Sequence, residues 1–342
     1  MKVFGFLLSL LIVSGTCYAQ GFSIGKLNNT TIKIDTSRKL LDLNLFRLDS
    51  LLEVTPKNDE IRYSAAWTKF AAGMYYTAKE EFEKILASNY DELEAYWGRA
   101  QCNIKLHKNY EAIQDLNLIL KITPESNQAL FQRGLLNLTL TDFEAGLTDL
   151  RTVTKRKEDT SLVLQSFKRQ YEYYLKRDQK EKAKTYLDSM VKFHPKDPEG
   201  WKLKGDFYTL IYRLEGAMQF YRKSIKEGGN CFIELAEIEY ELNKFFECVQ
   251  TSNRGLEYSS RKDSVHFLLN RGKAKSALSD QRGAITDLTN GIKISPKNPH
   301  LYFHRGHAKL LMENLEDACL DFSKAGELGI KKAYKVIHKE CK

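Results

Sequence analysis

The chain has 342 residues, of which 42% are hydrophobic and 28% charged, and it contains six prolines. This composition is too apolar for a disordered chain, and the length allows a large core. The formal net charge of +9 is unevenly spread: residues 155–184 carry ten Lys or Arg against five acids, and residues 331–342 carry five Lys against one Glu.

The N-terminus, MKVFGFLLSLLIVSGTCYAQ, has one early lysine, a short apolar run and then small residues up to Ala19. This pattern predicts a secretory signal peptide over residues 1–19, too short for a membrane span, with the mature chain beginning near Gln20. We therefore expect a periplasmic or extracellular protein. A lipid anchor on Cys17 in the envelope is the alternative. No later segment has the apolar length needed to cross a bilayer.

Residues 20–37 have no helical pattern, and we expect them to be extended or disordered. Residues 38–58 predict a lone helix that ends near Pro56. From there a period of 34 residues begins: Ala66, Ala100 and Gly134 share it, as do the positions 12 and 16 residues further on. Each period contains two apolar patterns of helical spacing, so the unit is a helix, a turn and a helix.

This pattern resembles the tetratricopeptide-repeat family, whose units have a bulky residue at position 4, small residues at 8 and 20, aromatic residues at 11 and 24, and Pro at 32. The unit WKLKGDFYTLIYRLEGAMQFYRKSI places Trp201, Gly205, Tyr208, Ala217 and Tyr221 at the first five of these positions. The resemblance implies an all-α fold, an α-solenoid forming a right-handed superhelix. We count eight units over residues 59–328, starting near 59, 93, 127, 164, 198, 229, 265 and 299, with a capping helix over residues 329–342.

The repeats also show covariation within one sequence. Four units have Arg at position 7 (Arg99, Arg133, Arg271, Arg305), and the same four have Asp at position 23 (Asp115, Asp149, Asp287, Asp321). This pairing predicts bidentate Arg–Asp bridges that join the two helices of a unit or of neighbouring units. Asp197-Pro198 and Asn298-Pro299 predict helix N-caps followed by proline in the first turn.

Five cysteines lie after the predicted leader, at irregular spacing and without a CxxC motif. We expect them to be small buried residues, with one bridge, for instance Cys319 to Cys341, as the alternative in an oxidising compartment. The motifs HExxH, GxSxG and GxGxxG are missing, and GFSIGKL is one residue short of a phosphate-binding loop. We therefore predict no enzyme activity and no cofactor.

The family resemblance implies a concave groove lined by positions 2, 5, 6, 9 and 12 of each first helix. Aromatic side chains occupy such positions at the N-terminal end and can anchor an extended peptide or an amphipathic helix. The rival interpretation is that residues 20–58 cover this track. The candidate peptide-binding residues are Tyr63, Trp67, Trp97, Gln101, Phe131, Gln132, Lys168, Lys202 and Phe303. The Lys/Asn carboxylate clamp of some family members is missing, because no unit has Asn at position 9.

Three histidines in HLYFHRGHAK lie at i, i+4 and i+7 of one expected helix, and His266 would be their neighbour. His266, His300 and His304 are the candidates for a metal site, although the seven-residue spacing separates His300 and His307 by roughly 10 Å along the axis. The alternative, which we prefer, is that they are polar groove residues that titrate near neutral pH.

Together these features predict a non-catalytic scaffold of the cell envelope that binds a peptide or protein segment in its groove. The alternative function is a fixed subunit of an envelope complex that uses the convex face or the basic segments, and His-based metal binding is a third. Nucleic acid is not an expected partner of an exported chain, whereas membrane association and acidic surfaces remain open.

Overall fold

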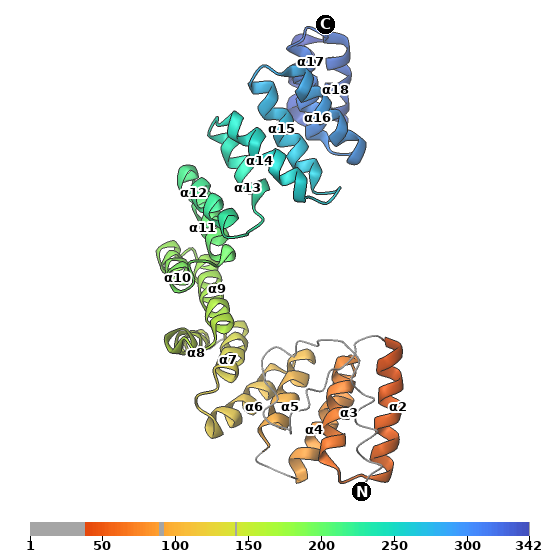
Figure 1. Ribbon diagram of the computed structural model, residues 1–342, viewed down its shortest axis with the longest axis vertical. Coiled ribbons are helices and arrows are strands. Elements are labelled where there is room, and N and C mark those ends of the chain that lie inside the picture. The colour runs from red at the N-terminus through yellow and green to blue at the C-terminus, as the bar shows by residue number, and fades with distance from the viewer. Residues whose placement is uncertain (1–37, 89–91, 141, 342) are drawn as a thin grey trace. The chain divides into compact units, whose positions relative to one another are not determined.

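The computed structural model describes residues 38–88, 92–140 and 142–341, except for the side chains of residues 38–41. All regular structure within these ranges is helical and comprises eighteen helices, α2 to α19 (Figure 1). The fold is an all-α solenoid, as predicted. The predicted leader, the segment 20–37 and Cys17 lie outside the described residues. None of the described helices has both the length and the apolar character required to span a bilayer.

The helices alternate as first and second members of the repeat units. The first helices are α3 (Asp59–Ala71), α5 (Leu93–Lys105), α7 (Asn127–Thr139), α9 (Thr160–Lys176), α11 (Pro198–Leu210), α13 (Phe232–Glu241), α15 (Ser264–Ala277) and α17 (Pro299–Leu310). The second helices are α4 (Tyr75–Ser88), α6 (Asn109–Ile122), α8 (Phe143–Arg156), α10 (Lys180–Phe193), α12 (Leu214–Lys226), α14 (Phe245–Tyr258), α16 (Gln281–Ile294) and α18 (Leu315–Glu327). Helices α2 (Arg38–Val54) and α19 (Lys331–Glu340) flank them.

The chain divides within α9 into two compact halves, residues 1–173 and 174–342. In the first half each described helix from α2 to α8 packs on the next, and α3 also touches α5. In the second half α10 to α19 pack in the same consecutive way, and α15 touches both α13 and α17. The first helices α3 and α5 therefore lie side by side in the first half, as do α13, α15 and α17 in the second.

The helix ends follow the predicted capping. The side chain of Asp197 accepts hydrogen bonds from the N–H groups of Glu199 and Gly200, and Asn298 accepts one from His300; a proline follows each cap in the first turn. Both predicted N-caps are confirmed.

The turn inside a unit contains a residue in the left-handed region in seven of the eight units; the corresponding residue of the third unit lies outside the described residues. Position 15 has positive φ in seven units, at Gly73, His107, Asp178, Tyr212, Asn243, Ser279 and Glu313. Only the first is glycine, so six residues with a Cβ atom occupy a conformation that glycine adopts with less strain. Tyr212, with φ 56°, is the bulkiest of them and is 89% exposed.

The predicted Arg–Asp bridges are present within the units. Each Arg of a first helix donates from Nε and Nη2 to an Asp of the second helix, and the Nη2–Oδ1 distances are 2.6 to 2.8 Å. The four pairs are Arg99–Asp115, Arg133–Asp149, Arg271–Asp287 and Arg305–Asp321. The Asp side chains are 3 to 7% exposed, so each buried carboxylate has its charge partner at hand.

The remaining guanidinium nitrogen reaches the preceding unit. Nη1 donates to a side-chain oxygen at position 25 of that unit in three cases: Arg133 to Asn117 at 2.7 Å, Arg271 to Asn253 at 2.7 Å and Arg305 to Thr289 at 3.1 Å. One guanidinium therefore ties two helices of its own unit to the unit before it.

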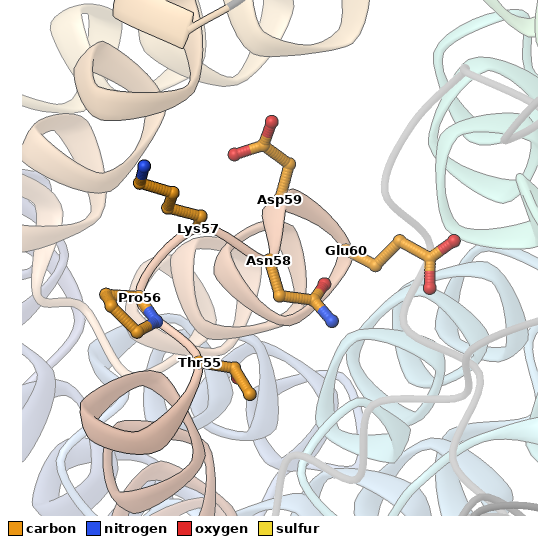
Figure 2. A pocket seen from close by; sticks show the side chains of 6 residues that line it. All are labelled: Thr55, Pro56, Lys57, Asn58, Asp59 and Glu60. Atoms are coloured by element: carbon orange, nitrogen blue, oxygen red, sulfur yellow. The ribbon is translucent and has the colours of Figure 1, made fainter. Parts of the chain in front are cut away.

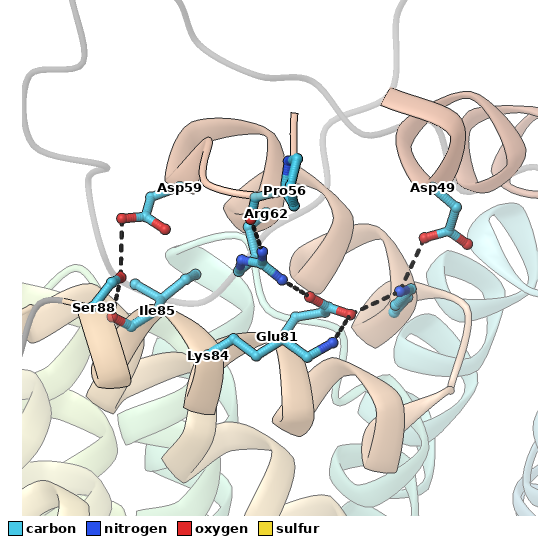
Figure 3. Close-up of polar contacts among 9 residues, drawn as sticks. Asp49, Pro56, Asp59, Arg62, Glu81, Lys84, Ile85 and Ser88 are labelled. Atoms are coloured by element: carbon cyan, nitrogen blue, oxygen red, sulfur yellow. Dashed lines mark hydrogen bonds and ion pairs between the residues drawn. The ribbon is translucent and has the colours of Figure 1, made fainter. Parts of the chain in front are cut away.

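The first unit, which departs from the family pattern at Arg62 and Lys69, builds a different ion network at the same place (Figure 3). Glu81 at position 23 pairs with Arg62 at 2.7 Å, Lys84 at 3.1 Å and Lys69 at 3.3 Å. Lys69 also pairs with Asp49 of α2 at 3.0 Å. Burial opposes ionisation of Glu81, yet the three cations lower its pKa overall. The two unusual cations, Arg62 and Lys69, thus share the carboxylate of Glu81. The pairing of Lys69 with Asp49 attaches α2 to the first repeat.

The last unit is closed by a disulfide between Cys319 of α18 and Cys341, which follows α19, with Cα atoms 5.9 Å apart. The expected alternative of one bridge is therefore the observed arrangement. Cys102, Cys231 and Cys248 are free and buried. Burial raises the pKa of their thiols to about 12, 11 and 12, which makes them weak nucleophiles at neutral pH.

Candidate functional site

The predicted aromatic residues of the first half lie on α3, α5 and α7 and are mostly covered. Trp97 is 5% exposed and Phe131 4% exposed, whereas Tyr63 and Trp67 are half-buried. The rings of Tyr63 and Trp67 pack edge-on against Phe82, at centroid distances of 6.2 and 5.2 Å. Side chains with so little exposed area offer a ligand contact only if the surrounding chain moves. The aromatic track stays a prediction.

Two acids accompany these rings at the start of α5. Burial raises the pKa of Glu94, and the nearby charge of Glu92 raises it further. Burial also raises the pKa of Tyr63, with Glu92 and Glu94 adding to the effect. The region around α3 and the start of α5 is therefore aromatic and acidic. The other candidate residues of the first half, Gln101 on α5, Gln132 on α7 and Lys168 on α9, are half-buried.

In the second half, Lys202 of α11 is already neutralised by acids. Its Nζ lies 2.7 Å from Glu234 of α13 and 3.4 Å from Asp206. Burial lowers its pKa, but the hydrogen bond to Glu234 and the two negative charges raise it overall. Because these partners hold the ammonium, Lys202 is a link between first helices rather than a free cation for a ligand.

The histidines lie where the sequence places them, on α15 and α17: His266 and His300 are exposed, whereas His304 and His307 are half-buried. His307 packs against the rings of Phe303 and Phe322, at 4.6 and 5.0 Å. Burial lowers the pKa of His304 to about 3, and the charge of Lys273 and the neighbouring His307 and His300 contribute. His304 is therefore neutral near pH 7.

The part of the chain that the structure describes contains no group of three or more His, Cys, Asp or Glu side chains that could hold a metal ion. His266, His300 and His304 thus gain no support as zinc ligands. The sequence also predicted that these histidines titrate near neutral pH. For His304 this prediction is wrong, because burial lowers its pKa far below neutral pH.

Lys273 of α15 occupies the middle of this face. Its Nζ lies 3.9 Å from the ring centroid of Tyr240 on α13, a cation–π contact. Burial lowers the Lys273 pKa although Cys248, Glu237 and Glu241 act in the opposite direction. Burial likewise raises the pKa of Glu237 on α13, despite the nearby charges of His266 and Lys273.

Glu237, Lys273 and His304 therefore form a row on three adjacent first helices, α13, α15 and α17, and in each of them burial disfavours the charged form. Of these three residues, only His304 was singled out from the sequence. The signal that could have found Lys273 is its place at position 9, next to the histidine positions of the following unit.

A separate open depression of about 660 Å³ lies at the turn between α2 and α3 and is lined by residues 55–60 (Figure 2). Its lining includes Lys57, Asp59 and Glu60, whose side chains in Figure 2 extend in different directions. Because these charged groups do not converge on one point, the depression has no binding chemistry that we can assign.

Comparison with known proteins supports the fold. No family model matches the chain. A curated relative, human Sperm-associated antigen 1, is 24% identical over 264 residues; the match covers 74% of this chain but only 27% of that protein. The chain thus spans about a quarter of that relative's length.

Among solved structures, the C-terminal part of a TPR repeat-containing protein from Cytophaga hutchinsonii superposes with a TM-score of 0.51 at 16% identity, over 80% of this chain and 98% of that one. A tetratricopeptide repeat protein from Parabacteroides merdae is 15% identical over 89% of this chain and 93% of its own, with a TM-score of 0.43. The molecule is a helical-repeat protein. More specifically, it has the tetratricopeptide-repeat fold, as the 34-residue period predicted.

Proposed function

We propose that the chain is a non-catalytic scaffold of the cell envelope that binds a segment of another protein on the face of its first helices. The fold supports protein–protein interaction in general terms, because side-by-side first helices provide an extended surface rather than a closed pocket. The three described free thiols, held protonated by burial, are unsuited to nucleophilic chemistry.

The observation that carries the proposal is the row formed by Glu237, Lys273 and His304. A polar or ionisable group that is buried without full compensation costs free energy, and the pKa of all three groups is shifted against the charged form. Groups with such shifted pKa values cluster at functional sites. A bound segment would replace the water that these groups lose and would offset part of that cost.

Two independent features support an envelope location. The N-terminal pattern of residues 1–19 predicts a secretory leader. The Cys319–Cys341 disulfide is of a kind that persists in oxidising compartments and is uncommon in a reducing cytosol.

A second candidate function, a fixed subunit that docks through its convex face, is favoured by exposed aromatic residues on the second helices. Tyr76 of α4, Tyr110 of α6 and Phe246 of α14 all occupy position 18 of their units and are 63, 66 and 61% exposed. Aromatic side chains on an exposed surface are common anchors at interfaces.

Site-specific photo-crosslinking in cells separates the two candidates. A photoreactive amino acid is placed at Leu269 or Phe303, half-buried positions 5 of α15 and α17, and at Tyr110 or Phe246 as matched second-helix controls. We expect Leu269 and Phe303 to crosslink the same protein and the controls to give none of it. Crosslinks from the controls alone would overturn the proposal and favour the fixed subunit.

A further inference from the structure

Helix α19 presents a row of lysines to solvent. Lys331, Lys335 and Lys339 follow one another at intervals of one helical turn, so they share one face and lie about 6 Å apart along the axis. Lys332 lies beside this row, and all four side chains are exposed. The opposite face of α19 packs into the core through the buried Ala333. The four lysines therefore form one basic surface, which we call the lysine face.

Few acids offset the charge of the lysine face. Lys339 pairs with Glu340 at 2.8 Å, whereas the other three lysines have no acidic side chain within ion-pair distance among the described residues. On the neighbouring α18, Glu327 is already paired with Lys324 at 2.9 Å. The positive field of the lysine face is therefore largely uncompensated within this part of the chain.

The lysine face belongs to a helix that is firmly held. The disulfide between Cys319 and Cys341 links the end of α19 to α18, and Ala333 is fully buried at the contact between the two helices. A ligand therefore meets charges that are already arranged, and binding does not have to order a flexible basic tail. Tyr334, 54% exposed, borders the same face three residues after Lys331.

The type of cation indicates the type of partner. The bridges inside the repeat units use Arg, whose planar guanidinium fits one carboxylate in a fixed geometry. Helix α19 has four Lys and no Arg. A lysine ammonium is a point charge on a flexible stem, so it suits a dense and fluid array of anions better than a single acceptor in one place.

We infer that the lysine face binds the surface of a membrane that contains anionic phospholipids, with Tyr334 at the level of the headgroups. Tyrosine is enriched at that level because its ring is apolar and its hydroxyl is polar. Each lysine close to such a surface strengthens binding about fivefold, so several lysines together hold the protein where one does not. The inference does not rest on the proposed function, because α19 is not one of the first helices.

The test measures co-sedimentation of the whole chain, in the form that accumulates in the producing cell, with lipid vesicles. Vesicles of phosphatidylglycerol mixed with phosphatidylcholine are compared with vesicles of phosphatidylcholine alone, at about 0.1 M salt, where the Debye length is about 10 Å. We expect binding to the anionic vesicles only. We also expect release at about 1 M salt, where the Debye length falls to about 3 Å. Equal binding to both kinds of vesicle would overturn the inference.

Paired substitutions separate the lysine face from the overall charge. The double variant Lys331→Gln, Lys335→Gln should bind the anionic vesicles about 25-fold more weakly, at about fivefold for each lysine. The control Lys293→Gln, Lys297→Gln removes two exposed lysines with the same spacing elsewhere in the second half, and should change binding less than about threefold. Circular dichroism checks that both variants remain helical. Equal weakening in the two variants would overturn the inference.

A soluble acidic polymer tests the other class of partner. Poly-glutamate carries the negative charge of an acidic polypeptide without a lipid surface, and we expect it to bind more weakly than the anionic vesicles. Binding as tight as that of the vesicles would assign the lysine face to an acidic protein and overturn the inference. The crosslinks from Leu269 and Phe303 report the proposed function separately, because neither double variant alters α15 or α17.

Discussion

Replacing Arg99 by Leu should destabilise its unit more than replacing Arg305 by Leu, although both arginines occupy position 7. Leucine keeps most of the apolar packing of the arginine stem, so the change chiefly removes the charge and its hydrogen bonds. Asp115, 3% exposed, would keep only Asn103 Nδ2 at 3.4 Å. Asp321, 6% exposed, would keep Lys309 Nζ at 2.9 Å.

Removing one partner of a buried ion pair costs about 3–5 kcal/mol because the other charge remains buried and uncompensated. We expect about 3 kcal/mol for Arg99→Leu, since Asp115 loses its ion-pair partner, and about 1 kcal/mol for Arg305→Leu, since Lys309 keeps Asp321 paired. Burial already raises the pKa of Asp115 against the effect of Arg99. Without Arg99 that pKa rises further, so the loss of stability in the variant should shrink as the pH is lowered and the carboxyl is protonated.

The appropriate assay is native-state hydrogen exchange of the α5–α6 and α17–α18 amides, because repeat arrays need not unfold in a two-state manner. The double variant Arg99→Leu, Asp115→Leu should recover much of the loss, since the orphaned charge is removed as well. Equal losses in the two single variants, or no recovery in the double variant, would show that the lysine backup and the buried charge do not determine the cost.

Three further outcomes are expected. Cys341→Ser should release the 22-residue link to Cys319 and lower the protection of α19 against exchange or proteolysis by about 3 kcal/mol; unchanged protection would mean that packing alone holds α19. Tyr212→Gly should raise the stability of the α11–α12 pair by roughly 0.5–1 kcal/mol, measured by urea unfolding, because glycine relieves the positive φ. The pKa of His304, about 3 when folded, lies below the usual 6.5, so the stability that it contributes is lost as the pH falls from about 6.5 towards 3. Exchange of α17 should report up to about 2 kcal/mol of loss by pH 5, and His304→Gln should remove that dependence.

The sequence was sufficient for the features that repeat. The helix pairs and the Arg–Asp bridges could be predicted because the same residue types return at the same position in several units, which serves as an internal alignment. The contact of three of these arginines with position 25 of the preceding unit could not be predicted, because that position holds Asn in two cases and Thr in the third. Two residue types that both offer an oxygen acceptor, an amide and a hydroxyl, look unrelated in the sequence.

The groove was harder to predict because position within a unit fixes the direction of a side chain but not what covers it. Trp97 and Phe131 have the groove-facing positions, yet they are 5 and 4% exposed. Large aromatic side chains are readily buried against adjacent helices, and the burial of each one stabilises the fold by a few kcal/mol. Lys273 occurs once at its position, so no repetition singled it out.

The sixth unit shows how far the chemistry of a position can change while its geometry is kept. There the acid lies on the first helix: Glu239, 1% exposed, accepts from Arg222 of the preceding unit at 2.7 Å and from Thr251 at position 23, also at 2.7 Å. The charges have exchanged helices: the acid lies at position 11 of the first helix, and its ion pair is with the arginine at position 25 of the preceding unit. The sixth unit, which lacks the Arg–Asp pair, is therefore still joined to the preceding unit by an ion pair. Lys273 and Glu237 lie outside these bridging positions, at position 9 of their units, and burial shifts the pKa of each against its charged form.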